Sequence, residues 1–240
     1  MRASNLNALS APRIVHKDDS IIVVDKPAGM PAVSLEKKEG GTLTSWLIGK
    51  FPALCNLEKG ELEAGLVHRL DNDTSGLMIA ARTAEAYRSL RKQFDDGRVD
   101  KEYVALVVGN PAAKGTINTP IAHHPRKKKK MIASPDGRPA ETRFKVIKRF
   151  GSKYALLQVK IKTGVRHQIR VHLASIGFPL AGDSLYRNPK KRSEDTLDLN
   201  RHFLHAAGLG FLHPKTDKWV EFSSELPADL KAALKSLTNL

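Results

Sequence analysis

The chain has little cysteine and no long apolar segment, and both shortages exclude whole classes of protein. Cys55 is the only cysteine among 240 residues, so neither a disulfide framework nor a thiolate metal cage can form within the chain. A chain without disulfides suits the reducing cytoplasm. No apolar run approaches the roughly 18 residues that a membrane span needs, and the N-terminal stretch lacks the apolar centre of a signal peptide. We therefore expect a cytoplasmic protein that is monomeric and has no membrane partner.

The sequence also lacks the motifs of common cofactor and metal sites. It contains no Walker loop, no GxGxxG and no GxSxG, so nucleotide-driven and serine-hydrolase chemistry have no support. None of its nine histidines shows the HExxH spacing. His202 and His205 would reach one ion if they lay on a helix, yet no further ligands accompany them. We expect no metal and no cofactor.

Positive charge, in contrast, is abundant. Lys and Arg number 40 against 25 acidic residues, which gives a formal net charge of +15. Such an excess favours a polyanionic partner, because each neutralised phosphate releases counterions, although a basic, soluble surface alone would also explain it. Five consecutive cations cannot pack together, so they indicate an exposed loop that either contacts phosphates or only aids solubility. The candidate phosphate-binding residues are Arg126, Lys127, Lys128, Lys129, Lys130 and Arg166.

The spacing of apolar residues predicts an α+β fold. A length of 240 residues with 41% hydrophobic residues allows one large domain or two small ones. Short apolar or alternating runs predict strands at residues 21–24, 76–82, 101–109 and 154–161. Apolar residues at helical spacing predict helices within residues 83–97, 166–177 and 226–237. Several strands with few helices between them suggest a mixed sheet with flanking helices.

For some polar residues both a chemical and a structural role are possible, and taken singly each is more commonly structural or solvated. Asp71 follows Arg69 and precedes an apolar run, where a carboxylate is costly unless it is paired; capping a turn is the commoner explanation. Tyr103 lies in an aliphatic strand, and its ring could stack on a base, although core packing is more usual. Arg166 and Arg170, four residues apart, would share a helix face and bind a phosphate or a buried acid.

Several stretches together resemble the motifs of the RluA-type pseudouridine synthase family. They are KPAGMPAV, HRLDNDTSGL, KEYVALVVG and TGVRHQIRVHLASIGFPLAGDSLY, and the resemblance covers nearly all of residues 14–214 in order. It implies an enzyme that isomerises selected uridines in ribosomal or transfer RNA to pseudouridine, with no cofactor and no metal. It also implies a mixed, mostly antiparallel central sheet with flanking helices and a catalytic cleft.

The resemblance assigns roles to four residues by their motif positions. Asp71 would be the catalytic aspartate and Arg170 its ion-pair partner. Tyr103 would stack on the target uracil, and Arg69 would enter the RNA helix where the target base leaves it. An arginine beside an aspartate keeps the carboxylate ionised, which agrees with this assignment. Whether the carboxylate attacks the sugar, attacks the base or removes a ribose proton stays open.

The chain departs from the family pattern in two ways. Val165 stands where the third motif usually carries an arginine. We also expect residues 1–13 to form an N-terminal tail and residues 14–240 a single catalytic domain, with no separate N-terminal RNA-binding domain. The alternative function is a non-catalytic RNA-binding protein or RNA assembly factor with a degenerate synthase domain. Asp71 separates the two, because a binding protein has no use for an acid among cations.

Overall fold

The computed structural model describes residues 11–33, 40–57, 60–187, 197 and 199–238. Of the expected N-terminal tail, residues 1–10 lie outside this range. In chain order the elements are β1 (Arg13–Lys17), β2 (Ile21–Lys26), α1 (Leu43–Lys50), η1 (Pro52–Asn56), α2 (Gly60–Glu63), β3 (Ser75–Ala81), α3 (Ala84–Asp95), β4 (Asp100–Val108), β5 (Lys114–Ile117), β6 (Ile121–His123), β7 (Met131–Ala133), β8 (Thr142–Phe150), β9 (Tyr154–Ile161), α4 (Gln168–Ser175), β10 (Leu204–Leu212), β11 (Trp219–Ser223) and α5 (Ala228–Thr238).

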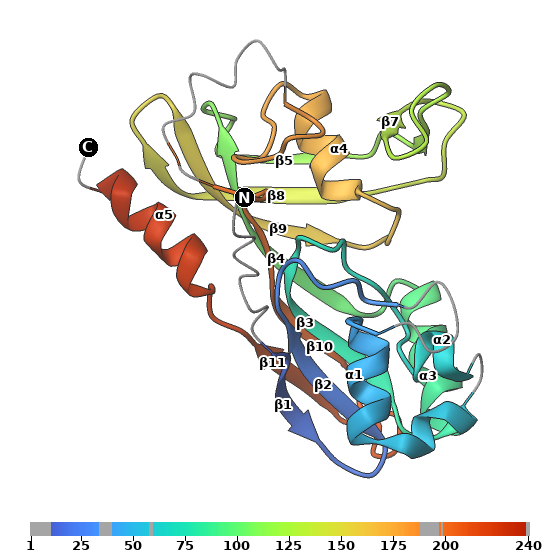
Figure 1. The fold of residues 1–240 in the computed structure, drawn as a ribbon. Coiled ribbons are helices and arrows are strands. Elements are labelled where there is room, and N and C mark those ends of the chain that lie inside the picture. Colours follow the sequence, from blue (N-terminus) through green and yellow to red (C-terminus); the bar gives the residue numbers. More distant parts are fainter. Residues whose placement is uncertain (1–10, 34–39, 58–59, 188–196, 198, 239–240) are drawn as a thin grey trace, which may run out of the picture.

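A nine-stranded sheet organises the described part of the chain (Figure 1). Its strands follow the order β1-β2-β3-β10-β4-β9-β8-β5, and β11 pairs with the second half of β10. The β3–β10 pair is parallel, whereas the other pairs in this sheet are antiparallel. β6 and β7 form a separate two-stranded hairpin. The mixed, mostly antiparallel sheet that the sequence predicted is therefore confirmed.

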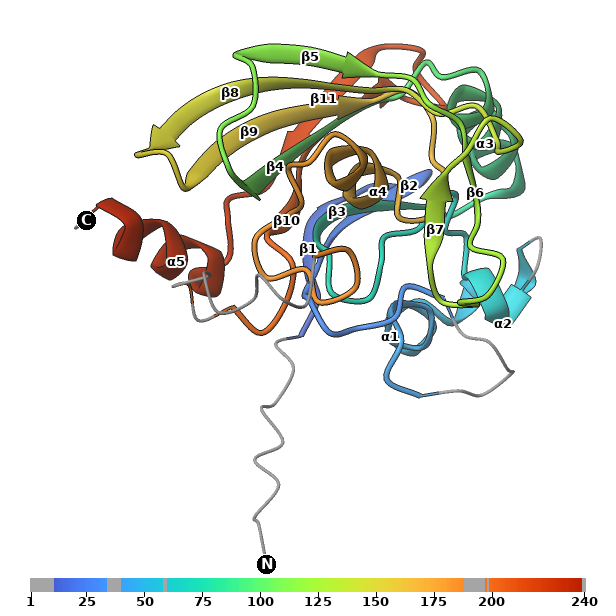
Figure 2. The ribbon, with the colours of Figure 1, turned by 90° about the horizontal axis from the view of Figure 1, so that it is seen from above.

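Helices cover both faces of this sheet. α1 and α4 lie on one face, where Leu43 and Leu173 belong to a single core cluster with side chains of β2, β3, β4 and β9. α3 packs on the opposite face, and α5 covers the far end of the sheet through Leu230. Viewed from above, α4 lies on the inner side of the curved sheet (Figure 2). This inner side is where the candidate site lies.

The parallel contact between β3 and β10 fixes the start of β3. Gly76 has a φ of 118°, and a Cβ there would lie 2.3 Å from the backbone oxygen of Ala206. Only glycine allows so close an approach of two backbones. The turn that carries Asp71 directly precedes β3, so this contact holds that turn over the middle of the sheet.

Most predicted elements are present, and several strands were not predicted. The predicted segments match β2, β3, β4, β9, α3, α4 and α5. Residues 13–17, expected in the tail, instead begin the sheet as β1, and the strands from β5 to β8 and β10 to β11 gave no clear sequence signal. None of the described helices is long and apolar enough to cross a membrane.

Candidate active site

Asp71 occupies the first position of a tight turn whose hydrogen bonding leaves its carboxylate free for other partners. The backbone N–H of Thr74 donates to the backbone oxygen of Asp71 at 3.1 Å, which closes the turn. The side chain instead accepts a hydrogen bond from Arg170, with 3.0 Å between Nη1 and Oδ2. No described residue donates a hydrogen bond to Oδ1. The carboxylate therefore does not cap the turn, and one of its oxygens is open to a substrate.

Arg170 binds a second carboxylate at the same time. Its Nε and Nη2 donate to the two oxygens of Asp183 at 2.7 and 3.0 Å, and the Asp183 side chain is fully buried. Burial alone would raise the pKa of Asp183, but the hydrogen bonds and charge of Arg170 outweigh it and hold that pKa below its ordinary value. Asp183 in turn fixes the guanidinium plane. The predicted Arg170–Asp71 contact is thus present, and it is braced by an acid that the sequence analysis did not single out.

Lys26 and Arg201 donate hydrogen bonds to the backbone of the Asp71 turn. Lys26 is fully buried, and its Nζ donates to the backbone oxygens of Pro27, Met30 and Asn72 at 2.8 to 3.0 Å. Burial lowers the pKa of Lys26 to about 7. Arg201 donates to the backbone oxygen of Asp73 at 3.0 Å. Asn72 and Asp73, the two residues that follow Asp71, are therefore fixed in space.

His202 and His205 each hydrogen-bond a hydroxyl group of the segment that follows the Asp71 turn. His202 Nε2 lies 2.8 Å from Thr74 Oγ1, and His205 Nδ1 lies 2.9 Å from Ser75 Oγ. The two histidines do not lie on a helix, because His205 belongs to β10 and His202 just precedes it. Alternation along an extended chain separates their contacts.

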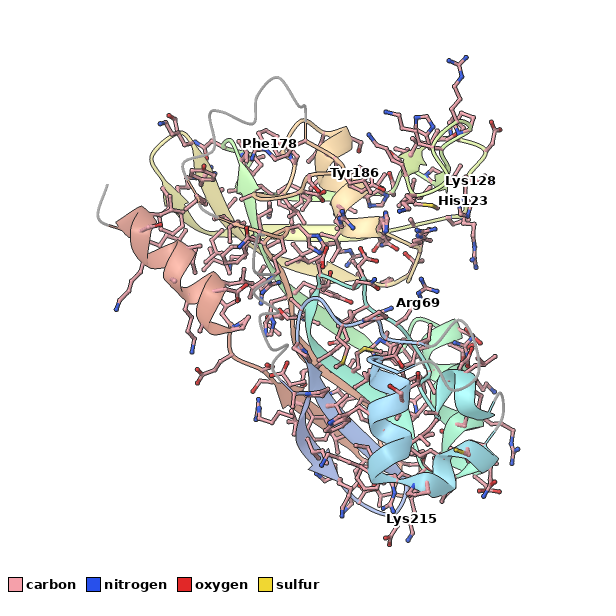
Figure 3. The ribbon with its side chains drawn as sticks, in the orientation of Figure 1. Arg69, His123, Lys128, Phe178, Tyr186 and Lys215 are labelled. Atoms are coloured by element: carbon pink, nitrogen blue, oxygen red, sulfur yellow. The ribbon has the colours of Figure 1, made fainter. Side chains whose placement is uncertain are left out.

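Asp71, Tyr103 and Arg69 line one cavity of about 770 Å³ between the Asp71 turn, β4 and α4. Tyr103 is only 6% exposed, which is more buried than we expected for a stacking residue. Burial and the charge of Asp71 both raise the pKa of the Tyr103 hydroxyl, so it stays protonated. Arg69 is exposed at the rim, on the same edge of the molecule as His123 and Lys128 (Figure 3). The three predicted residues do come together.

The five adjacent cations connect β6 to β7, and four of them are exposed as predicted. These four are Arg126, Lys127, Lys128 and Lys129. Lys130 is half-buried, with its Nζ 5.2 Å from the centre of the Tyr186 ring. The premise that none of the five can pack was therefore wrong for Lys130, because an aromatic face offers a cation a partner that another cation does not.

Arg166 is exposed, but it does not share a helix face with Arg170. α4 begins at Gln168, and His167 precedes it with a left-handed φ of 58°. Arg166 lies in a turn, closed by the hydrogen bond from the Gln168 N–H to the Val165 oxygen, and Arg170 lies in α4. Helical spacing therefore does not apply to the two arginines. Arg166 points to solvent, whereas Arg170 is 8% exposed.

Residues 20–175 match the family described as RNA pseudouridylate synthase. The chain belongs to the RNA pseudouridylate synthase family. An uncharacterized RNA pseudouridine synthase of Chloroflexus aurantiacus is 46% identical over 213 residues, which are 89% of this chain and 65% of the relative. Ribosomal large subunit pseudouridine synthase D of Nitrosomonas europaea is 38% identical over 231 residues, 95% of this chain and 66% of the relative. The chain thus spans just under two thirds of the length of these relatives.

A solved structure has the same fold as this RNA pseudouridylate synthase family member. It is human RNA pseudouridylate synthase domain containing 1, with a TM-score of 0.72 and 24% identity, and the match covers 96% of each chain. This likeness confirms the predicted fold.

The sequence analysis missed the residues that hydrogen-bond other side chains of this site. Asp183, Tyr186 and His167 lie inside the stretch that resembles the third motif, but only Arg166 and Arg170 were singled out there. Asp183 follows Arg170 by 13 residues across a helix end, a spacing without a characteristic period. One signal could have found Asp183: an arginine has five N–H donors and can bind two carboxylates, and Asp183 is the one acidic residue of the same motif.

Proposed function

We propose that this protein isomerises specific uridines to pseudouridine in structured RNA and that Asp71 is the catalytic carboxylate. One observation carries the proposal: Asp71 lines the cavity with Oδ1 free, while Arg170, braced by Asp183, holds Oδ2. Such a carboxylate is fixed in orientation with one oxygen accessible, as either a nucleophile or a base requires. A protein that only binds RNA gains nothing from this arrangement.

The reaction breaks the N1–C1′ bond of uridine and forms a C5–C1′ bond, with a proton lost from C5 and one gained at N1. The base must first leave its stack, at a cost of a few kcal/mol. In our proposal the exposed Arg69 fills the space that the base vacates, and the Tyr103 ring stacks on the uracil in the cavity. Arg170 orients the Asp71 carboxylate through a charge-assisted hydrogen bond.

Positive residues around the cavity would hold the RNA backbone. We assign phosphate contacts to the exposed cations of the β6–β7 connection and to Arg166. Lys130 also contributes charge there, although it packs on Tyr186. We further propose that these residues of the catalytic domain, 14–240, select the target RNA and that the protein acts as a cytoplasmic monomer.

We propose ribosomal RNA, in preference to transfer RNA, as the substrate. This rests on the relative of Nitrosomonas europaea, whose name assigns it to the large ribosomal subunit. It is a similarity of sequence, and the cavity itself does not distinguish the two kinds of RNA.

The test is to incubate the protein with protein-free large-subunit ribosomal RNA and, separately, with total transfer RNA, and to map pseudouridine in each. Asp71→Asn is the matched control, since it keeps the shape and removes the charge. New pseudouridine at defined ribosomal positions, absent with the control, is expected. Product in transfer RNA alone would contradict the substrate, and no product in either with tight RNA binding would favour the alternative of a non-catalytic RNA-binding protein.

A further inference from the structure

His167 has an unusual backbone at the entrance to α4. Its φ of 58° and ψ of 17° place it in the left-handed region that residues with a Cβ rarely adopt. Its side chain is 10% exposed and lines the cavity that contains Asp71. Strained backbone of this kind persists where surrounding contacts impose it, and it concentrates at functional sites.

The two ring nitrogens of His167 face different partners. Nε2 lies 3.9 Å from Asp71 Oδ2, the same oxygen that accepts the hydrogen bond from Arg170. Nδ1 lies 2.8 Å from the hydroxyl oxygen of Tyr186. His167 therefore connects the Asp71 carboxylate to the Tyr186 hydroxyl.

Hydrogen bonding at Tyr186 determines which ring nitrogen of His167 carries the proton. The backbone N–H of Met131, at the start of β7, donates to the Tyr186 hydroxyl oxygen at 2.9 Å. The hydroxyl proton is then free to point at His167 Nδ1. Burial lowers the pKa of His167, so the imidazole is neutral at pH 7 and bears one N–H. With Nδ1 accepting, that N–H is on Nε2 and points toward Asp71.

Tyr186 is itself fixed from three directions. Its backbone N–H donates to Asp183 Oδ1 at 3.2 Å. Its ring centre lies 5.1 Å from the Arg170 guanidinium carbon and 5.2 Å from Lys130 Nζ. The ring also belongs to the small apolar cluster through which the β6–β7 hairpin packs on α4.

We propose that His167 is a positioning residue for Asp71 and that Tyr186 orients it. The Nε2–H of His167 and Nη1 of Arg170 both attract Oδ2, which turns Oδ1 toward the substrate. This inference rests on the proposed function, because positioning matters only if Asp71 reacts. In this proposal Tyr186 and Lys130 help to position His167, whereas the exposed cations of the β6–β7 hairpin contact RNA phosphates.

The test uses variants that spare the fold. His167→Gly removes the imidazole and suits the left-handed φ, and Tyr186→Phe removes the hydroxyl and keeps the ring. At saturating RNA, we expect the single-turnover rate of pseudouridine formation to fall about 10²-fold in His167→Gly and about tenfold in Tyr186→Phe. The dissociation constant for RNA should not change. Tyr154→Phe, a buried tyrosine in the cluster beneath α5, is the control and should keep the wild-type rate.

Two further readouts separate positioning from general support of the structure. The double variant should be no slower than His167→Gly, because Tyr186 acts through His167. Added imidazole should restore part of the rate of His167→Gly and none of the rate of Asp71→Asn.

Additive losses in the double variant would overturn the role of Tyr186. A wild-type rate in His167→Gly, with wild-type protein active, would overturn the proposal and leave the proposed function intact. Wild-type protein that forms no pseudouridine in any RNA would overturn both.

Discussion

Asp71 shares its arginine with a second, more deeply buried carboxylate, and the two acids have different consequences. Asp183 is fully buried and meets Arg170 through two hydrogen bonds, whereas Asp71 meets it through one and keeps an oxygen free. Asp183 thus holds the Arg170 guanidinium in place, and Arg170 in turn orients Asp71. Each acid can be tested by an isosteric amide.

Asp71→Asn should abolish turnover and leave RNA affinity unchanged. A negative charge cannot help to hold a polyanion, so its loss weakens nothing in the bound ground state. We expect the single-turnover rate to fall by roughly 10³-fold or more, as when other catalytic groups are removed. Filter binding and pseudouridine mapping on the same RNA measure the two effects, and a variant that retains a tenth of the rate would contradict the assignment of Asp71.

Asp183→Asn should lower stability as well as activity. Removing one partner from a buried ion pair costs about 3–5 kcal/mol, and we expect the lower end because Asp71 still faces Arg170. Asp229→Asn is the matched control, since Asp229 also binds an arginine, Arg201, but its side chain is 51% exposed. Urea unfolding should show a loss of about 1 kcal/mol or less for the control. Equal losses in the two variants would contradict the importance that we give to Asp183.

At the scale of elements, the β6–β7 hairpin divides its cations between two tasks. Lys130 packs on Tyr186 next to the site, whereas the preceding cations point into solvent. Each phosphate contact adds roughly 0.7 to 0.9 to the slope of log affinity against log salt concentration. Replacing Lys127, Lys128 and Lys129 by Ser should therefore flatten that slope by roughly two to three units.

The same triple variant should keep a wild-type rate at saturating RNA, because the packed Lys130 is retained. Titrations between low and physiological salt, with single-turnover assays alongside, measure both quantities. An unchanged slope would show that the hairpin cations do not contact RNA, and a collapsed rate would show that they help to build the site.

Elements were predictable from the sequence where packing imposes a regular period or a continuous apolar run. β2 and β3 are continuous apolar runs because both faces of each strand are buried. β9 alternates, and α3 shows its apolar residues at helical spacing. β6 and β7 have three residues each, too few for a period, and β8 carries exposed charges that mask its buried Phe144. In the site, the family motifs predicted Asp71, Tyr103 and Arg170. Asp183 and Tyr186 lie in the irregular segment after α4, where no periodicity predicts which side chains meet.

At the scale of the whole molecule, buried histidines make folding sensitive to acid. Burial lowers the pKa of His202 to about 4 and that of His68 to about 3, below the ordinary value of 6.5. Between pH 6.5 and about 4 the unfolded chain binds protons that the folded chain excludes, so the free energy of unfolding falls as the pH falls. Asp183, whose pKa is lowered by Arg170, adds a further loss below about pH 3.8.

Urea unfolding from pH 7 to pH 4 measures this dependence. His202→Gln should show a shallower fall of stability with pH than the wild type. His123→Gln, at an exposed histidine, should show the wild-type fall. Stability that stays flat between pH 6.5 and 4 would contradict the burial argument.

The parallel pairing of β3 with β10 delays completion of the Asp71 turn until late in synthesis. Ser75 pairs with His205, 130 positions later in the chain. At roughly 5–20 residues per second, a ribosome needs about 7–26 s to pass from one to the other. For nearly all of that interval Asp71 has been synthesised, but Arg201 and His202, which fix its turn, have not. The nascent chain, already rich in positive charge, therefore lacks an ordered Asp71 turn until its last strands have joined the sheet.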